Sequence, residues 1–257
     1  MKNARNILPL LLLLLFLTGC EHKAIPTVPT ATPTTSSTPT TQTTTSTAPL
    51  HSPLYLENTD TEDVITYFNE VCLDAEFVNG GDASLLQKWD SPIRYRILGD
   101  PTEQDLDVLY GFTDTLNAVN GFPGIREITD DNGYCNMQIH FCSHDEMIDI
   151  MGDRFQDMDG AVTFWYEENR IYNATICIRT DLDRHLRNSV ILEELYNSLG
   201  PIQDTALRQD SIIYADYAEP QALTPVDELL LKLLYHPQML CGMNAAECET
   251  VIRQLYY

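Results

Sequence analysis

The chain has few basic residues: it carries 15 Lys and Arg against 38 Asp and Glu, a formal net charge of −23 over 257 residues. A nucleic-acid partner needs a basic surface, and this sequence contains no basic stripe along which a phosphate backbone can lie. The same negative charge repels anionic lipid headgroups. We therefore expect no nucleic-acid partner, and a folded part that is held away from anionic membrane surfaces.

Several motifs that carry enzyme chemistry are also missing. The sequence has no Cys-x-x-Cys pair, which argues against a thiolate metal site. It has no glycine-rich phosphate loop and no nucleophile elbow. His140 and His144 are four residues apart, but we expect His140 on a strand and His144 at the start of the next element. The metal-ligand spacing of a single helix therefore does not apply to them.

The N-terminus has the features of an export signal. Lys2 and Arg5 precede an apolar run over residues 8–17, which is too short to span a bilayer as a mature helix. The run ends in Leu-Thr-Gly-Cys20, which resembles a bacterial lipobox. We therefore expect a lipoprotein signal peptide at residues 1–19 and a lipidated Cys20 that anchors the protein on the outer face of the cell membrane. The alternatives are an ordinary secretory signal or an uncleaved anchor.

Composition divides the rest of the chain into two parts. After Cys20, residues up to 53 are rich in Thr, Ser and Pro and contain almost no large apolar side chains, so they cannot offset the entropy of ordering. We expect residues 20–53 to form an extended linker. Residues 54–257 have the length of one domain.

Periodicity within residues 54–257 alternates between helix and strand. Apolar residues at helical spacing predict helices, and two-residue alternation predicts strands, the last two of which form a hairpin around residues 167–169. This order predicts an α+β fold. The expected helices are residues 60–73, 83–87, 102–119, 144–151, 183–200, 224–235 and a last helix ending at 255; the expected strands are residues 93–97, 135–142, 161–166 and 170–179.

Without Cys20, six cysteines remain, and an even number outside the cytoplasm predicts at least one disulfide. Cys135 and Cys142 lie about 23 Å apart if they share a strand, too far to bond to each other. Cys177, on the neighbouring strand, can reach one of them. The pairing stays open, and free buried cysteines are the alternative. The six are Cys72, Cys135, Cys142, Cys177, Cys241 and Cys248.

The segment over residues 183–200 is the centre of the sequence. Its apolar arc, which includes Leu195 and Leu199, predicts burial against a sheet. Glu193, Glu194 and Asn197 fall on another side, beside further apolar residues, so we expect a helix covered on two sides. Carboxylates between two layers need donors or a proton. The alternative is that they are solvated.

This helix and its surroundings resemble a known family. Residues 193–200, Glu-Glu-Leu-Tyr-Asn-Ser-Leu-Gly, look like the H-E-x-x-H-x-L-G helix of zinc metallopeptidases. Residues 211–214, Ser-Ile-Ile-Tyr, and the Leu-Thr-Pro-Val-Asp at 223–227 resemble the segments that follow it in zincins. With the Trp-Asp-Ser-Pro-Ile at 89–93, they resemble more closely the family catalogued as domain of unknown function 2927, from about residue 64 to residue 257.

The resemblance implies a zincin-like fold. Its parts would be a twisted mixed sheet with a hairpin edge, a backing helix, a central site helix and a helical C-terminal part. The zinc ligands do not carry over, because neither helix position offers the imidazole that zinc prefers. Gln203 stands at the third-ligand spacing, with Asp204 beside it, and Ile213 replaces the methionine of the turn. We therefore expect no bound metal and no other cofactor.

Two functions remain open. The favoured one is a non-hydrolytic binding module for a peptide, glycan or protein, and the alternative is a peptidase-like hydrolase that uses zinc or another divalent ion, with Glu194 as general base. Glu194 has a catalytic role only in the hydrolase. Around Glu194 we expect an internal polar network with Arg179, Arg184 and Arg187 as donors. The other residues expected in the site are Glu193, Asn197, Gln203, Asp204, Ser211 and Tyr214.

Overall fold

The computed structural model describes residues 54–73, 85–130, 132–201, 203–216 and 218–257. The predicted signal peptide, Cys20 and the linker lie outside these residues, as do residues 83 and 84 of the short helix predicted at residues 83–87. The part of that helix that is described, residues 85–87, is not helical. Within the described ranges, no helix has the length and apolar character to cross a membrane.

A mixed sheet of five strands forms one layer of the structure. The strands are β1 (Ile93–Gly99), β2 (Ile125–Glu127), β3 (Met137–Cys142), β4 (Gly160–Glu167) and β5 (Arg170–Arg179). Their order is β2-β1-β3-β5-β4, and only β4 runs antiparallel to its neighbour, β5. The predicted hairpin is confirmed. We missed β2, because three residues are too few to show a period.

The turn of the β4–β5 hairpin shows how local chemistry sets this edge of the sheet. Glu168 and Asn169 both have positive φ, 48° and 61°. This backbone matches the right-handed twist of paired strands, and Asn adopts it more readily than most residues. β4 is therefore fixed against β5 by a two-residue turn and becomes the outer strand of the sheet.

Six α-helices lie in the described part of the chain, and every predicted helix except the one at residues 83–87 is confirmed. Four of them, α2, α3, α5 and α6, begin with a capping box. A short 3₁₀ helix, Asp153–Phe155, follows α3. The helices are α1 (Thr61–Leu73), α2 (Glu103–Asn117), α3 (His144–Met151), α4 (Arg184–Asn197), α5 (Pro225–Leu234) and α6 (Ala245–Leu255).

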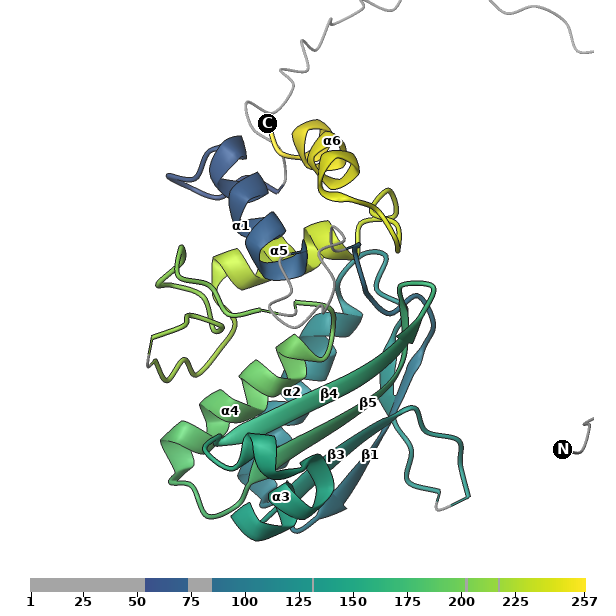
Figure 1. Ribbon diagram of the computed structural model, residues 1–257, viewed down its shortest axis with the longest axis vertical. Coiled ribbons are helices and arrows are strands. Elements are labelled where there is room, and N and C mark those ends of the chain that lie inside the picture. Colours follow the sequence, from purple (N-terminus) through teal and green to yellow (C-terminus); the bar gives the residue numbers. More distant parts are fainter. Residues whose placement is uncertain (1–53, 74–84, 131, 202, 217) are drawn as a thin grey trace, which may run out of the picture. The chain divides into compact units, whose positions relative to one another are not determined.

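The helices form a layer on the sheet and a separate helical part. α4 contacts β4, β5 and α2, while α3 contacts β4 and β5. Figure 1 shows α2 and α4 running along the sheet, with α1, α5 and α6 grouped beyond the C-terminal end of α4. Leu195 and Leu199 are each 1% exposed, so the predicted burial of the apolar arc is confirmed. The α+β class with a helical C-terminal part is also confirmed.

The predicted disulfide is not present. All six cysteines in the described residues are free. Cys142 and Cys177 pack in one small apolar cluster with Met147 and Ala161. Cys142 is paired with Arg179 and Cys177 with His140, so the two cysteines hold diagonal positions on neighbouring strands. Their thiols are in contact without a disulfide, and the hydrogen bond between them lowers the pKa of Cys142.

Candidate functional site

Both ends of α4 are held by hydrogen bonds from side chains, in addition to the backbone hydrogen bonds within the helix. At the start, the Asp183 side chain accepts hydrogen bonds from the backbone N–H groups of His185 and Leu186. At the end, the Trp89 indole donates to the Ser198 carbonyl at 2.9 Å, and the Tyr235 hydroxyl donates to the Leu199 carbonyl at 2.7 Å. These two bonds satisfy carbonyl groups at the C-terminal end of α4. They also hold the last turn of the helix in place.

Glu194 is buried at the contact between α4 and the edge strand. Its side chain lies against Gly160, the first residue of β4: a Cβ at residue 160 would come within 2.7 Å of Oε1 and 2.8 Å of Cγ of Glu194. The same Cβ would lie even closer to Cγ1 of Val190, so glycine at residue 160 leaves room for both side chains of α4. Glu194 is 8% exposed, and none of the described residues donates a hydrogen bond to its side chain. No pattern in the residues around Gly160 indicated this role.

The two adjacent carboxylates hold their protons more tightly than ordinary glutamates. Burial, with smaller contributions from the charges of Asp204 and Asp159, raises the pKa of Glu193 to about 7. Burial, followed by the charges of Glu193 and Asp204, raises the pKa of Glu194 well above its usual range. Glu193 is half-buried and Asp204 is exposed. The structure therefore brings Glu193, Glu194 and Asp204 within electrostatic reach of one another.

The predicted arginine donors do not serve this pair. Arg184 and Arg187 both form ion pairs with Asp105, at the first turn of α2. Arg179 pairs with Asp159 and Asp181. The prediction was wrong because the first turn of α4 packs against α2, so the guanidinium groups meet a carboxylate that is distant in sequence and fully buried.

Two amide oxygens of the expected site also lack donors. The side-chain oxygens Oδ1 of Asn197 and Oε1 of Gln203 are buried and accept no hydrogen bond. Native proteins leave few such atoms unsatisfied, and each one points to strain or to a missing partner. Asn197 follows Glu193 by one helical turn, so both lie on the same side of α4.

Ser211 and Tyr214 have other partners. Ser211 is buried, and its hydroxyl donates to Oδ1 of Asp227 at 2.7 Å and lies 3.0 Å from the Tyr67 hydroxyl. Tyr214 donates to Asp216 at 2.9 Å, on the exposed side of the loop. In the described part of the chain, no hydrogen bond links either residue to Glu193 or Glu194.

The network around Ser211 has its own structural role. Asp227 is fully buried and also accepts from the backbone N–H groups of Ile212 and Thr224, at 3.2 and 2.8 Å. The Tyr196 hydroxyl of α4 donates to the Asp227 carbonyl at 3.1 Å. These bonds fasten the loop and α5 to the other side of α4. The predicted cluster therefore divides into a donor-poor acidic part and a satisfied structural part.

The donor set of the acidic part does not suit zinc. Zinc favours imidazole or thiolate ligands, usually three from the protein at a catalytic site. Here the nearby groups are carboxylates and amide oxygens, together with the buried Cys177 thiol, whose pKa the hydrogen bond with Cys142, burial and the charge of Glu194 raise. The residues described in the structure contain no group of three or more His, Cys, Asp and Glu placed to hold a metal ion. The acidic part therefore does not fit the zinc site of the peptidase helix that its sequence resembles.

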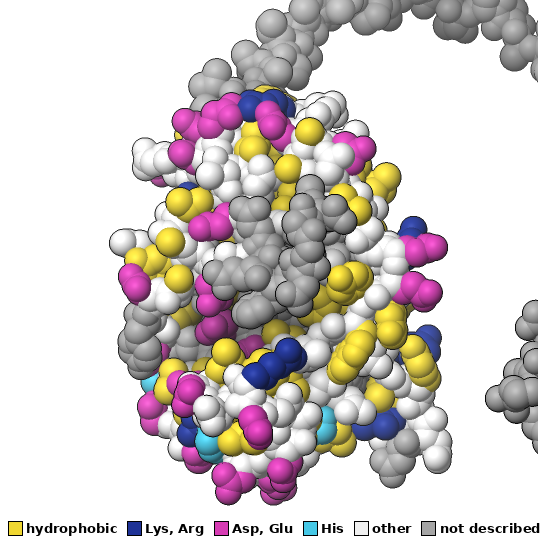
Figure 2. Space-filling model, viewed as in Figure 1, with side chains coloured by type: hydrophobic (Ala, Val, Ile, Leu, Met, Phe, Trp, Pro, Cys, Tyr) yellow, Lys and Arg dark blue, Asp and Glu magenta, His cyan; other side chains and the backbone are white. Residues whose placement is uncertain are grey.

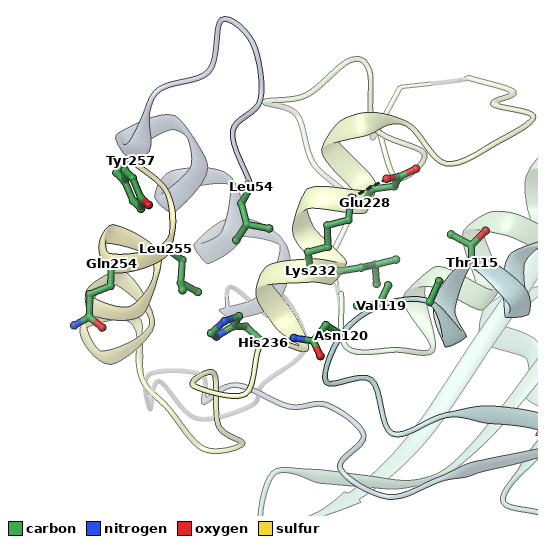
Figure 3. Close-up of a pocket in the computed structure, with 12 residues that line it drawn as sticks. Leu54, Thr115, Val119, Asn120, Glu228, Lys232, His236, Gln254, Leu255 and Tyr257 are labelled. Atoms are coloured by element: carbon green, nitrogen blue, oxygen red, sulfur yellow. Dashed lines mark hydrogen bonds and ion pairs between the residues drawn. The ribbon is translucent and has the colours of Figure 1, made fainter. Parts of the chain in front are cut away.

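The structure also contains a cavity that we did not predict. It has a volume of about 780 Å³ and opens between the end of α2, α5 and the C-terminal residues (Figure 3). Leu54, Val119 and Leu255 contribute apolar walls, and the Lys232–Glu228 ion pair, 2.9 Å, lies on one side. None of the residues expected in the site lines it.

Comparison with known families agrees with the resemblance noted in the sequence. No match was found among curated proteins. The family described as Protein of unknown function (DUF2927) matches residues 61–254, which includes the whole sheet, α4 and nearly all of the helical C-terminal part. The chain belongs to this family, DUF2927.

Proposed function

We propose that this protein is a lipid-anchored, extracytoplasmic binding module with a zincin-like domain, which holds an extended peptide along β4 without cleaving it. The observation that carries this proposal is an edge strand whose first residue lies against the buried Glu194. An exposed edge strand offers unpaired N–H and C=O groups, and an added peptide strand is a common way to satisfy them.

The two edges of the sheet differ in what they offer a peptide. β2 has three residues and β4 has eight. Proteins protect an edge by keeping it short, so β2 is a poor template and β4 is a good one. Trp165 and Tyr166 on β4 are 44% and 48% exposed. Figure 2 shows hydrophobic side chains gathered over this part of the sheet, where they can contact alternate residues of a bound strand.

The zincin-like assignment rests on the arrangement of elements. An antiparallel hairpin forms one edge of the sheet, α2 and α4 pack against each other, and α4 contacts the hairpin directly. This is the layout that the resemblance implies. The acidic, donor-poor side of α4 takes the place of the zinc ligands, which is why we favour binding over hydrolysis.

Peptide binding can be tested on the full chain purified in detergent. We expect pools of amidated random heptapeptides to bind and to slow amide exchange in residues 160–167. Trp165→Ala should weaken binding, whereas Tyr134→Ala, which removes an exposed aromatic far along the chain from β4, should not. Failure of every pool to bind would refute the peptide proposal.

The hydrolase alternative has one observation in its favour, the pKa of Glu193 near 7, which is the range of an effective general acid or base. Elemental analysis and peptide digestion separate the two functions. One zinc per chain, together with peptide cleavage that is lost in Glu194→Gln, would establish the hydrolase. We expect no stoichiometric zinc and intact peptides.

The anchor is tested at Cys20, the last residue of the lipobox-like motif. In Cys20→Ala the protein should leave the membrane fraction or stay as an unprocessed precursor, because no lipid can be attached. Intact-mass measurement of the wild-type protein is the direct check. An unlipidated wild-type chain beginning at another residue would contradict the anchor.

A further inference from the structure

One side of α4 presents acceptors that lack donors. Glu194 is more than nine-tenths buried, and no described residue donates to its carboxylate. Asn197 adds a buried Oδ1 without a donor. Glu193 lies one turn before Asn197, half-buried and without an ion pair to any described residue. What this side of the helix lacks is therefore a group rich in N–H donors.

The nearby cations are already committed elsewhere. Arg184 and Arg187 pair with Asp105, and Arg179 pairs with Asp159 at 3.0 Å. The Lys88 ammonium donates to the carbonyls of Leu234 and Met239, at 2.7 and 2.5 Å. Arg184, Arg187 and Lys88 cannot turn to the Glu193–Glu194 pair without leaving a buried partner unsatisfied, and Arg179 is held by two more exposed carboxylates, Asp159 and Asp181. The missing donor has to come from outside this part of the fold.

Resting on the peptide-binding function above, we propose that the bound peptide carries a basic residue that places its side chain against α4, donating to Glu193, Glu194 and Asn197. Arginine suits the site better than lysine, because its planar guanidinium offers five donors in a fixed fork and is more easily desolvated. The site would thus select arginine-containing segments among extended peptides.

An organic cation fits this side of α4 better than a metal ion. A metal would need three or more converging ligand side chains, and the described residues do not supply such a group. A guanidinium needs only acceptors on one side of a helix, and Asn197 lies four residues after Glu193 and three after Glu194, so it is a neighbour of both. The strongly acidic chain, with 38 acidic residues against 15 basic ones, also attracts a cationic peptide and speeds its association.

The test compares heptapeptide pools with randomised flanks and one fixed central residue: arginine, lysine, citrulline or glutamate. Citrulline has the shape of arginine without its charge. We expect the arginine pool to bind the full chain about tenfold or more tightly than the citrulline pool, as charge-assisted bonds to a buried site imply. The lysine pool should fall between them, and the glutamate pool should be weakest.

The variants connect this preference to α4. In Glu193→Gln the arginine preference should shrink, and in Glu193→Gln combined with Glu194→Gln it should disappear while the citrulline pool still binds. Glu57→Gln removes an exposed carboxylate elsewhere and should keep the full preference. The citrulline pool also reports whether each variant is folded, because its binding depends on β4 rather than on the carboxylates.

Two outcomes would overturn the inference, and they are distinct. Equal binding of the arginine and citrulline pools would refute the basic side chain but leave peptide binding along β4 in place. A preference for arginine that survives in the double variant would place the basic side chain elsewhere on the acidic surface. Absence of binding by all four pools would instead refute the proposed function itself.

Discussion

Asp105 of α2 and Glu194 of α4 are two buried carboxylates on neighbouring helices with opposite surroundings. Asp105 accepts hydrogen bonds from the backbone N–H and the hydroxyl of Thr102, both at 2.8 Å, and ion pairs from Arg184 and Arg187. Glu194 receives no hydrogen bond from any described residue and has Glu193 as its neighbour. One carboxylate is fully satisfied by the fold, and the other is not.

The difference appears in their protonation. Burial by itself would raise the pKa of Asp105, but the bonds from Thr102 and Arg184 and the charge of Arg187 outweigh it and hold the pKa below its usual value. For Glu194, burial and the neighbouring negative charges act in the same direction and raise the pKa. A satisfied carboxylate stabilises the fold, whereas an unsatisfied one costs stability and is available to a ligand.

The largest effect should come from removing the satisfied carboxylate. Asp105→Ala leaves two guanidinium groups without their carboxylate, and that of Arg187 is buried, so we expect a loss of about 3–5 kcal/mol in the free energy of unfolding. Urea denaturation measures it. Asp107→Ala, on the exposed side of the same helix, should stay within about 0.5 kcal/mol of wild type. Equal losses in both variants would show that Asp105 is not the anchor of the two arginines.

The buried apolar arc of α4 shows how much the packing of this helix contributes to the free energy of unfolding, for comparison with its charged residues. Leu195→Ala should cost about 2–5 kcal/mol, because a buried leucine leaves a cavity that closes only in part. Leu207→Ala, at a leucine that is 52% exposed, is the matched control and should cost little. If Leu195→Ala lost less than about 0.5 kcal/mol in denaturant, α4 would have to lie on the surface instead.

The smallest effect should be a pH dependence at the unsatisfied pair. The folded pKa of Glu193 is about 7, above the ordinary value of 4.5. Below pH 4.5 both the folded and the unfolded chain carry the proton, and stability is unaffected. Between pH 4.5 and pH 7 the unfolded chain has lost the proton while the folded chain still holds it, and above pH 7 the folded chain loses it as well. Glu193 should therefore lower the free energy of unfolding by up to about 3 kcal/mol as pH rises through 7.

Thermal melts at pH 5 and pH 8 measure this slope. Glu193→Gln should flatten it, with the variant gaining on wild type at pH 8, while Glu57→Gln should leave it unchanged. Asp105 contributes with the opposite sign, because its lowered pKa gives stability that is lost as pH falls. A slope that Glu193→Gln does not change would mean that water or an ion already satisfies Glu193 in solution.

Much of the fold could be predicted because its signals are local. The arc of Leu195 and Leu199 gave the buried face of α4, and two-residue alternation gave the β4–β5 hairpin. The residues of the acidic part, Glu193 and Glu194, were also predicted. The hydrogen-bond partners of Ser211 were not predicted, because its hydroxyl lies beside that of Tyr67, which is 144 residues earlier in the chain.

The sequence by itself determined the elements and their ends. Each capping box joins residues three apart, such as Thr102 and Asp105, so its geometry needs no distant partner. Only the tertiary structure decided which buried carboxylate received donors. Arg184 reaches Asp105 across 79 residues, and Gly160 of β4 makes room for Glu194, because both outcomes depend on how α4 packs between α2 and the sheet. Spacing along the chain holds no information about such contacts, since packing of distant segments sets them.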